Sequence, residues 1–353
     1  MWKDSVVASR LGIAWPIIQG PFGGGLSTVR LTTAVSNKGG LGSFGAHMLK
    51  PSEIEELVGS IRSKTSNPFA INLWVDDSDS EMSRLTRDAF EMRRADYSHL
   101  YEKLGVTPPA FLEEPGNGFE SQIEAVLESR PDVLSFVFGI PSKSILETCR
   151  ERGITTIGAA TTVEEALAIE AAGVDMVLAT GFEAGGHRPS FIDRSDESLM
   201  GTVALIPLVR DALKIPVIAA GGIGDGRGLS AAFSLGADAV QLGSAFLACE
   251  ESGASELHRG KLLAKEHERT VLSRAFSGRL ARFLPNGFIK EFDEQGKEAL
   301  PYPAQSWLVS ALKKGALETG NEDYMALYSS QVAPILKHRN VDNLMDELIA
   351  SME

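Results

Sequence analysis

The chain has 353 residues, 43% of them hydrophobic and 23% charged, and its formal net charge is −13. An acidic surface repels nucleic acid and anionic membranes, and no apolar run reaches the roughly 18 residues of a membrane span. The two cysteines, Cys149 and Cys249, provide neither a disulfide framework nor a metal cluster, so we expect no metal site. These features predict a cytoplasmic protein, a monomer or homodimer, that acts on a small molecule without a nucleic-acid or membrane partner.

Eight apolar runs typical of buried strands follow one another along the chain. They cover residues 15–20, 41–45, 69–74, 132–139, 155–159, 174–179, 215–220 and 238–244. Helical patterns alternate with them, at residues 27–37, 51–61, 119–129, 142–152, 161–173, 206–213 and 227–235. Such alternation indicates an α/β protein whose parallel sheet is covered on both faces. Eight repeats favour a closed (β/α)8 TIM barrel over an open, doubly wound sheet.

Two parts of the chain depart from this alternation and predict additions to the barrel. Residues 76–118 are charged and proline-containing, and we expect an insertion there with one or two helices and a loop across the top of the molecule. The barrel domain then spans residues 1–250. Residues 251–353 form a mostly helical C-terminal region, which includes the last barrel helix, a small lid-like subdomain and a loop at 277–303.

The most distinctive stretch is Leu178–Arg188, where a predicted strand ends in three glycines and a histidine. In a barrel, the carboxyl ends of the strands meet at one opening, here called the mouth, which holds the active site. Glycines allow the backbone to approach a ligand, and His187 has the side chain best suited to proton transfer near neutral pH. The alternative interpretation is a tight turn with a surface histidine. Glu183 is expected to accept hydrogen bonds from the backbone of its own loop.

Further glycine-rich breaks follow three other predicted strands, at residues 20–25, 221–224 and 243. The last two occupy the usual phosphate site of this fold, after its seventh and eighth strands. Gly222 and Gly243 admit close backbone approach there, and Ser244 adds a hydroxyl. Together they predict a phosphorylated ligand, although no Rossmann fingerprint is present.

On these motifs the chain resembles the nitronate monooxygenase family (formerly 2-nitropropane dioxygenases), which are FMN-dependent barrels. The resemblance extends from about residue 10 to 315, and the Glu-Ala-Gly-Gly-His run at 183–187 is its most specific part. The other matching stretches are 19–25, 36–42, Asn72, 220–223, 241–244, 277–279 and Asn286.

The resemblance implies that FMN lies across the mouth and that His187 takes the α-proton of a neutral nitroalkane. O2 then completes conversion to a carbonyl compound and nitrite. The implied flavin contacts are Gly20, Pro21, Phe22, Gly23, Asn72, Thr180, Gly185, Gly186, Gly221, Gly222, Gln241, Gly243 and Ser244. The residues expected to line the substrate are Tyr302, Val137 and Gly24.

Some positions differ from the family pattern and leave the substrate open. Thr180 stands where many relatives have glutamine, Pro189 where glycine is usual, and Val137 where some members carry histidine. An NAD(P)H:quinone reductase and a flavin-dependent enoyl-thioester reductase are alternatives on the same barrel, and a non-catalytic flavin-binding protein is a third. His47 and the Lys313-Lys314 pair are further candidates for the mouth, whereas Trp74 is more typical of a core.

Overall fold

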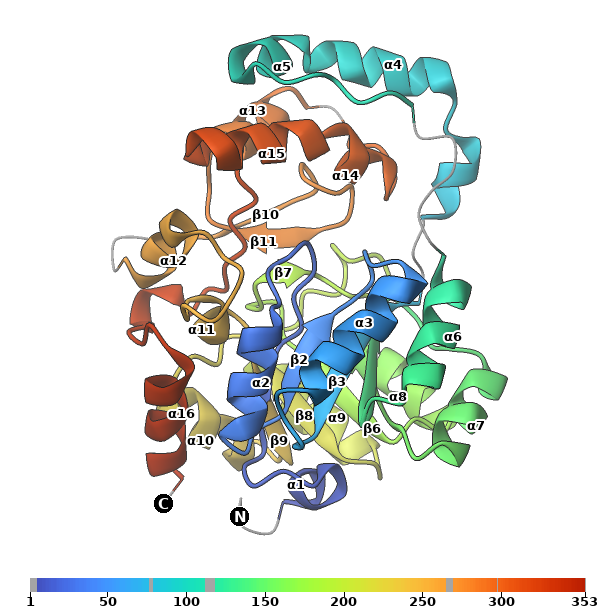
Figure 1. Cartoon of the computed structure of the whole chain (residues 1–353), viewed down its shortest axis with the longest axis vertical. Helices are drawn as coiled ribbons and strands as arrows, with labels where there is room; N and C mark the ends of the chain where they lie inside the picture. The colour runs from blue at the N-terminus through green and yellow to red at the C-terminus, as the bar shows by residue number, and fades with distance from the viewer. Residues whose placement is uncertain (1–4, 76–78, 112–117, 265–268, 297, 353) are drawn as a thin grey trace.

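The computed structural model describes residues 5–75, 79–111, 118–264, 269–296 and 298–352, and Figure 1 shows its fold. Eight parallel strands form one sheet, in the spatial order β1-β9-β8-β6-β5-β4-β3-β2. Their bounds are β1 (Ile17–Gln19), β2 (Gly42–Gly45), β3 (Phe69–Trp74), β4 (Val133–Val137), β5 (Thr155–Ala160), β6 (Met176–Thr180), β8 (Val217–Ala220) and β9 (Ala239–Leu242). Every one of the eight predicted strands is present.

The sheet closes on itself between its first two strands. Ile18 and Leu41 form a parallel bridge beside β1 and β2, and the backbone N–H of Gln19 donates to the carbonyl of Leu41 at 2.9 Å. The side-chain Oε1 of Gln19 accepts a further hydrogen bond from Ser43 N, also at 2.9 Å. The predicted (β/α)8 barrel is therefore confirmed over the open sheet.

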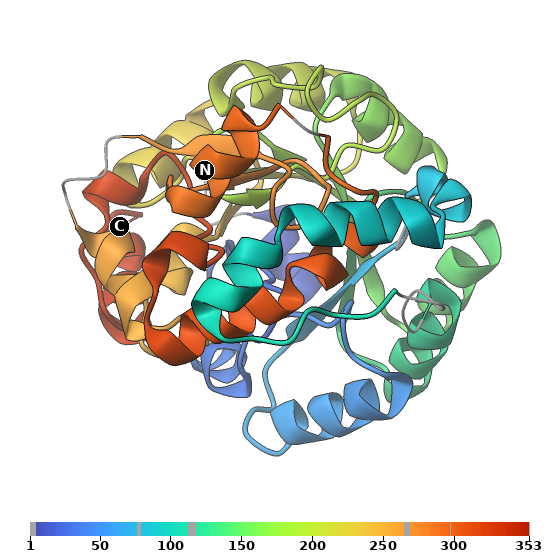
Figure 2. The ribbon, with the colours of Figure 1, turned by 90° about the horizontal axis from the view of Figure 1, so that it is seen from above.

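Helices surround the barrel as a ring, which Figure 2 shows from above. Helix α16 (Val341–Ala350) completes this ring, because it packs on the helices that follow β1, β8 and β9. The ring helices before it are α2 (Val29–Asn37), α3 (Pro51–Arg62), α6 (Phe119–Ser129), α7 (Lys143–Glu151), α8 (Val163–Ala171), α9 (Thr202–Ala212), α10 (Gly226–Ser234) and the short α11 (Ser244–Leu247).

Helix α9 begins at Thr202, earlier than the predicted residue 206. The Glu183 carboxylate accepts hydrogen bonds there from Thr202 N at 2.9 Å and from Thr202 Oγ1 at 3.0 Å. A carboxylate at a helix N-terminus satisfies free backbone N–H groups and interacts favourably with the helix dipole. Glu183 thus holds the first turn of α9 where its own loop ends, and the expectation that its carboxylate accepts backbone hydrogen bonds is confirmed.

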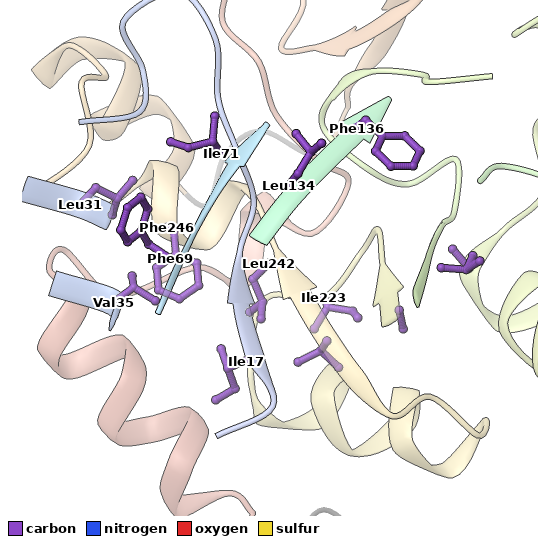
Figure 3. Packing of buried hydrophobic residues seen from close by; sticks show 14 of the residues in the cluster. Ile17, Leu31, Val35, Phe69, Ile71, Leu134, Phe136, Ile223, Leu242 and Phe246 are labelled. Atoms are coloured by element: carbon purple, nitrogen blue, oxygen red, sulfur yellow. The ribbon is translucent and has the colours of Figure 1, made fainter. Parts of the chain in front are cut away.

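The hydrophobic core leaves only one end of the barrel available for a site. Between sheet and helices, Leu31 and Val35 of α2 belong to one buried cluster with Phe69 and Ile71 of β3 (Figure 3). A separate cluster of inward-facing strand residues also includes side chains of α1 (Val6–Leu11), which lies beyond the amino ends of the strands (Figure 1). The amino end of the barrel is therefore packed with side chains, and the mouth lies at the other end.

The insertion and the C-terminal region together build a second hydrophobic cluster above the mouth. Helices α4 (Arg87–Asp96) and α5 (Ser98–Leu104) lie over α13 (Gly287–Glu294), α14 (Ala304–Leu308) and α15 (Ser310–Thr319) (Figures 1 and 2). The Tyr101 hydroxyl donates to the buried carbonyl of Leu308 at 2.8 Å. Phe90 and Tyr97 pack in the same cluster as Phe276 and Phe288. We call residues 79–111 and 271–328 the upper unit.

The predicted helices of the insertion are confirmed by α4 and α5, while residues 76–78 and 112–117 of its predicted span lie outside the described residues. The loop predicted at 277–303 was wrong. Strand β11 (Ala281–Phe283) pairs with β10 (Val271–Ser273) and with β7 (Gly186–His187), and helix α13 follows. Strands of two or three residues carry too little periodicity to be read from sequence, and β7 lies far from β11 in the chain.

No helix in the described ranges is long and apolar enough to cross a bilayer. Within the same ranges, no three His, Cys, Asp or Glu side chains are grouped as a metal site would require. Both cysteines are buried, and burial raises the pKa of the Cys149 thiol to about 11.

Candidate active site

The loop after β6 continues into strand β7, and the pairing of β7 with β11 holds His187 at the mouth. Gly186 pairs with Arg282 of β11 and His187 pairs with Ala281. Gly185 must be a glycine, because a Cβ there would lie 2.6 Å from backbone atoms of the Ser329–Ser330 segment. The glycines of this motif therefore bring two distant backbone segments together beside His187.

The His187 ring is oriented by Ser277. Its Nε2 lies 2.8 Å from Ser277 Oγ, and that hydroxyl is 3.2 Å from the carbonyl oxygen of Arg279. A carbonyl only accepts, so the Ser277 proton points to Arg279 and His187 Nε2–H donates to Ser277 Oγ. We assign the lone pair of the neutral ring to Nδ1 on this network.

Four aromatic rings surround the indole of Trp74 at the end of β3. His47 stacks on it at 3.9 Å between ring centroids with an interplanar angle of 6°, and His187 meets it edge-on at 5.0 Å. Phe138 lies at 4.7 Å and Tyr302 at 5.2 Å. The strand ends and the upper unit thus share one aromatic cluster, and the structure brings the predicted residues His187 and Tyr302 together in it.

Arg279 joins this cluster to the insertion. Its guanidinium lies 4.2 Å from the Phe138 ring centroid and 4.6 Å from that of Tyr302. Its Nε donates to Asp79 Oδ1 at 2.8 Å, and Asp79 Oδ2 accepts from Tyr302 N at 2.7 Å. A planar guanidinium both stacks on rings and binds carboxylates, so Arg279 fixes the upper unit to the mouth.

Burial and neighbouring cations keep the histidines neutral. Burial lowers the pKa of His187 to about 3, with smaller contributions from His47, Arg279 and Lys313. Burial also lowers the pKa of His47 to about 3, with a smaller contribution from Arg279. Burial lowers the pKa of the Lys313 ammonium, on α15, to about 8. Two cationic side chains, Arg279 and Lys313, are among the groups that lower the His187 pKa, and Arg279 is paired with Asp79.

A separate group of glycines and serines, here called the β8–β9 cluster, lies at the ends of β8 and β9. Gly221 and Gly222 have φ of +98° and +69°, and a Cβ on Gly243 would meet nothing closer than Phe22 at 3.9 Å. Ser244 Oγ accepts from Ser330 N at 2.9 Å. The Ser330 hydroxyl is buried and has no partner within the described chain. Buried hydroxyls are normally paired, so the β8–β9 cluster suits an oxyanion.

The remaining predicted contacts lie on strand ends and on the loop after β1. Asn72 Nδ2 donates to Ser135 Oγ at 3.0 Å, Thr180 is buried at the end of β6, and Gln241 is half-buried on β9. Gly20 N donates to Leu242 O at 2.8 Å. Phe22 N donates to Ser27 Oγ at 2.9 Å, within the loop that also contains Pro21 and Gly23.

Of the four remaining candidate residues, two lie at the site and two at the surface. Val137 ends β4 beside Trp74, its partner in the sheet register. Gly24 is exposed and has open space around it, so the structure does not bring it to the aromatic cluster. Lys313 faces the site, whereas Lys314 points outward and pairs with Glu318 at 3.9 Å.

Sequence reasoning missed four elements of the site. Trp74 was interpreted as a core residue, and Arg279, Asp79 and the Ser329–Ser330 segment were assigned no role. A cationic or acidic residue in an irregular stretch carries no periodic signal, so only their contacts reveal them.

The chain matches a family model described as nitronate monooxygenase over residues 5–351. The chain belongs to the nitronate monooxygenase family. A probable nitronate monooxygenase from Staphylococcus haemolyticus is 38% identical over 355 residues, which cover 100% of this chain and 98% of the relative. One from Staphylococcus aureus strain JH9 is 37% identical, with 99% and 97% covered.

Solved structures agree with membership of the nitronate monooxygenase family. A nitroalkane oxidase from Streptomyces ansochromogenes has a TM-score of 0.88 and 35% identity over 98% of this chain and 97% of its own. FabK from Thermotoga maritima has a TM-score of 0.75 and 27% identity, with 98% and 95% covered. The protein is thus an oxidoreductase, and its family implies a flavin cofactor.

Proposed function

We propose that the protein is an FMN-dependent nitronate monooxygenase that oxidises alkyl nitronates, or their parent nitroalkanes, with O2 to carbonyl compounds and nitrite. The observation that carries this proposal is the neutral imidazole of His187 near the buried ammonium of Lys313 and near Arg279, which is paired with Asp79. A nitronate is an anion, and buried cations favour binding of an anion far more than of a neutral molecule.

His187 is the proposed base for neutral nitroalkanes. With a pKa of about 3 its ring is unprotonated at neutral pH, so Nδ1 is ready to accept a proton. A low pKa also makes imidazole a weak base, and the nearby cations offset this weakness. Negative charge develops on the nitro oxygens as the proton leaves carbon, and Lys313 and Arg279 stabilise that charge. The nitronate anion then favours the protonated ring through their mutual attraction.

The β8–β9 cluster supports FMN as the flavin. Its unpartnered Ser330 hydroxyl and the open face of Gly243 suit a terminal phosphate, and Gly222 adds a backbone segment of positive φ. Bound flavin supplies the electron-accepting chemistry that side chains lack. The chain's part is to hold the phosphate, place the substrate beside His187 and exclude water.

A methyl group at Gly243 tests this assignment. We expect Gly243→Ala to weaken FMN binding about tenfold, because the added carbon occupies space the phosphate needs. The free energy of unfolding without flavin should change by less than about 1 kcal/mol, since no protein atom is crowded. Fluorescence titration with FMN and urea unfolding measure the two quantities. Gly59→Ala, in open space on α3, is the control, and equal FMN affinity in both variants would contradict the phosphate assignment.

Oxygen uptake decides between this function and its alternatives. We expect the flavin-loaded protein to consume O2 and release nitrite with alkyl nitronates, while anaerobic NADH or NADPH leaves the flavin oxidised. Rapid flavin reduction by NAD(P)H without nitronate turnover would instead indicate a quinone or enoyl-thioester reductase. If neither reaction occurs, the result would indicate a non-catalytic flavin-binding protein.

We infer that the upper unit covers the substrate, because it contributes Tyr302, Arg279 and Lys313 to the mouth. The predicted domain division at residue 250 changes in one respect, because the insertion packs with the C-terminal region. The cytoplasmic location and the oligomeric state, monomer or homodimer, stay predictions from the sequence.

A further inference from the structure

The site contains a second imidazole that the proposed mechanism does not use. His47 follows β2 and stacks flat on Trp74, while His187 meets the same indole by its edge. His47 is also one of the groups that lower the His187 pKa. Because the two rings contact one indole, a single small molecule beside Trp74 lies within reach of both.

The Nδ1 atom of His47 is buried and unpartnered within the described residues. Buried polar atoms are paired in native proteins, and those that are not often face a ligand or ordered water. The orphaned nitrogen lies in the aromatic cluster of the mouth, so a bound ligand is its natural partner.

The ring is held in place from several sides. Gln122 Nε2 donates to the carbonyls of His47 and Leu49, each at 2.8 Å, which fixes the loop after β2. A Cβ on Gly23 would lie 2.2 Å from His47 Cε1, so the ring lies directly against the loop after β1. With Trp74 on one face, the imidazole has a fixed position, which is what a preorganised binding group requires.

Burial and Arg279 keep His47 neutral, so it offers one N–H donor and one lone pair without adding charge beside Lys313. A nitro or nitronate group presents only oxygen acceptors. Donation to such an oxygen strengthens as negative charge builds there, and a fixed donor needs no reorganisation when it does.

We propose that His47 is a further substrate-binding residue of this site, whose Nδ1–H donates a hydrogen bond to an oxygen of the nitro or nitronate group that reacts beside His187. The inference rests on the proposed function. His47 transfers no proton in it; the residue binds one oxygen while His187 acts on the carbon.

Isosteric substitutions separate the two ring nitrogens. The amide nitrogen of Asn lies near the position of His Nδ1, and that of Gln near Nε2, while Phe keeps only the ring that stacks on Trp74. We expect His47→Gln and His47→Phe to weaken binding of nitrite, the oxyanion product, about tenfold. We expect His47→Asn to retain nitrite affinity within about threefold of the parent. Calorimetric titration of the flavin-loaded protein measures this without turnover.

His99→Phe is the matched control, since that histidine lies on the upper unit and pairs with Glu291. Equal nitrite affinity in all His47 variants, or an equal loss in the Asn and Gln variants, would overturn the proposal. So would the Asn-versus-Gln pattern appearing in FMN affinity instead of nitrite affinity. If the Phe variant does not fold, the Asn and Gln pair decides alone. Absence of nitronate oxidation by the parent protein would sink the proposed function, while the nitrite titration would still report on His47.

Discussion

Replacing His187 with Asn is expected to remove oxygen uptake on neutral nitroalkanes and to retain most of it on preformed nitronates. Only the neutral substrate needs a base, and loss of a positioned base typically costs on the order of 10² to 10⁴ in rate. Asn keeps a similar size, so the packing beside Trp74 and Ser277 should persist. Oxygen-electrode assays with nitroethane and with its nitronate give the two rates.

The pH dependence provides a second measurement on the same residue. Since burial lowers the His187 pKa to about 3, the free ring stays unprotonated from about pH 5 upward. The rate with neutral nitroalkanes should therefore not fall as the pH is lowered through 6.5, the ordinary pKa of histidine.

Ser277→Ala is the matched control for His187→Asn, because it removes only the group that orients the ring. We expect it to slow neutral nitroalkanes less than His187→Asn does. Retention of full activity on neutral nitroalkanes by His187→Asn would contradict the assignment of the base.

Lys313→Met should raise the KM for nitronates about 30-fold. Removing one member of a buried charge pair costs about 2 kcal/mol or more, and Met keeps the length of the side chain. The parent protein should itself bind nitronates more weakly as pH rises through about 8, since burial lowers the Lys313 pKa to that value and the cation is lost. Steady-state kinetics with ethyl nitronate between pH 6 and 10 measure both effects.

Lys314→Met is the control for this prediction. Lys314 is the next residue on α15, but its ammonium points to solvent and pairs with Glu318 at the surface. Exposed pairs contribute little, so its KM and pH profile should match the parent. If Lys313→Met and Lys314→Met behaved alike, or if the alkaline rise in KM persisted in Lys313→Met, the cation would have no role in binding the anion.

The barrel could be predicted from the sequence because its signals are local. Most strands are apolar runs, and some end at a glycine, as at Ala220-Gly221 and Leu242-Gly243; such a run can be interpreted without knowing its partner. The barrel places these ends at one mouth by topology alone. His187 could therefore be selected before any geometry was known.

Other parts of the site could not be predicted, because they depend on pairings between distant segments. Strand β7 exists only through its contact with β11, and Arg279 acquires a role only where Asp79 and Tyr302 meet. His47 was a candidate for the mouth because it follows a predicted strand, but its stack on Trp74 could not be predicted. Short strands and single side chains of this kind carry no periodic pattern.

The two-part origin of the upper unit has a consequence for synthesis of the chain. Phe90 and Tyr97 belong to an apolar cluster that residues 275–327 complete, and the ribosome makes every strand from β4 to β9 in between. A nascent chain therefore carries the uncovered apolar face of α4 and α5 while the barrel is being assembled, a state prone to aggregation. The apolar face of the insertion is therefore covered only after the barrel strands have been made, and truncation before residue 275 leaves that face exposed.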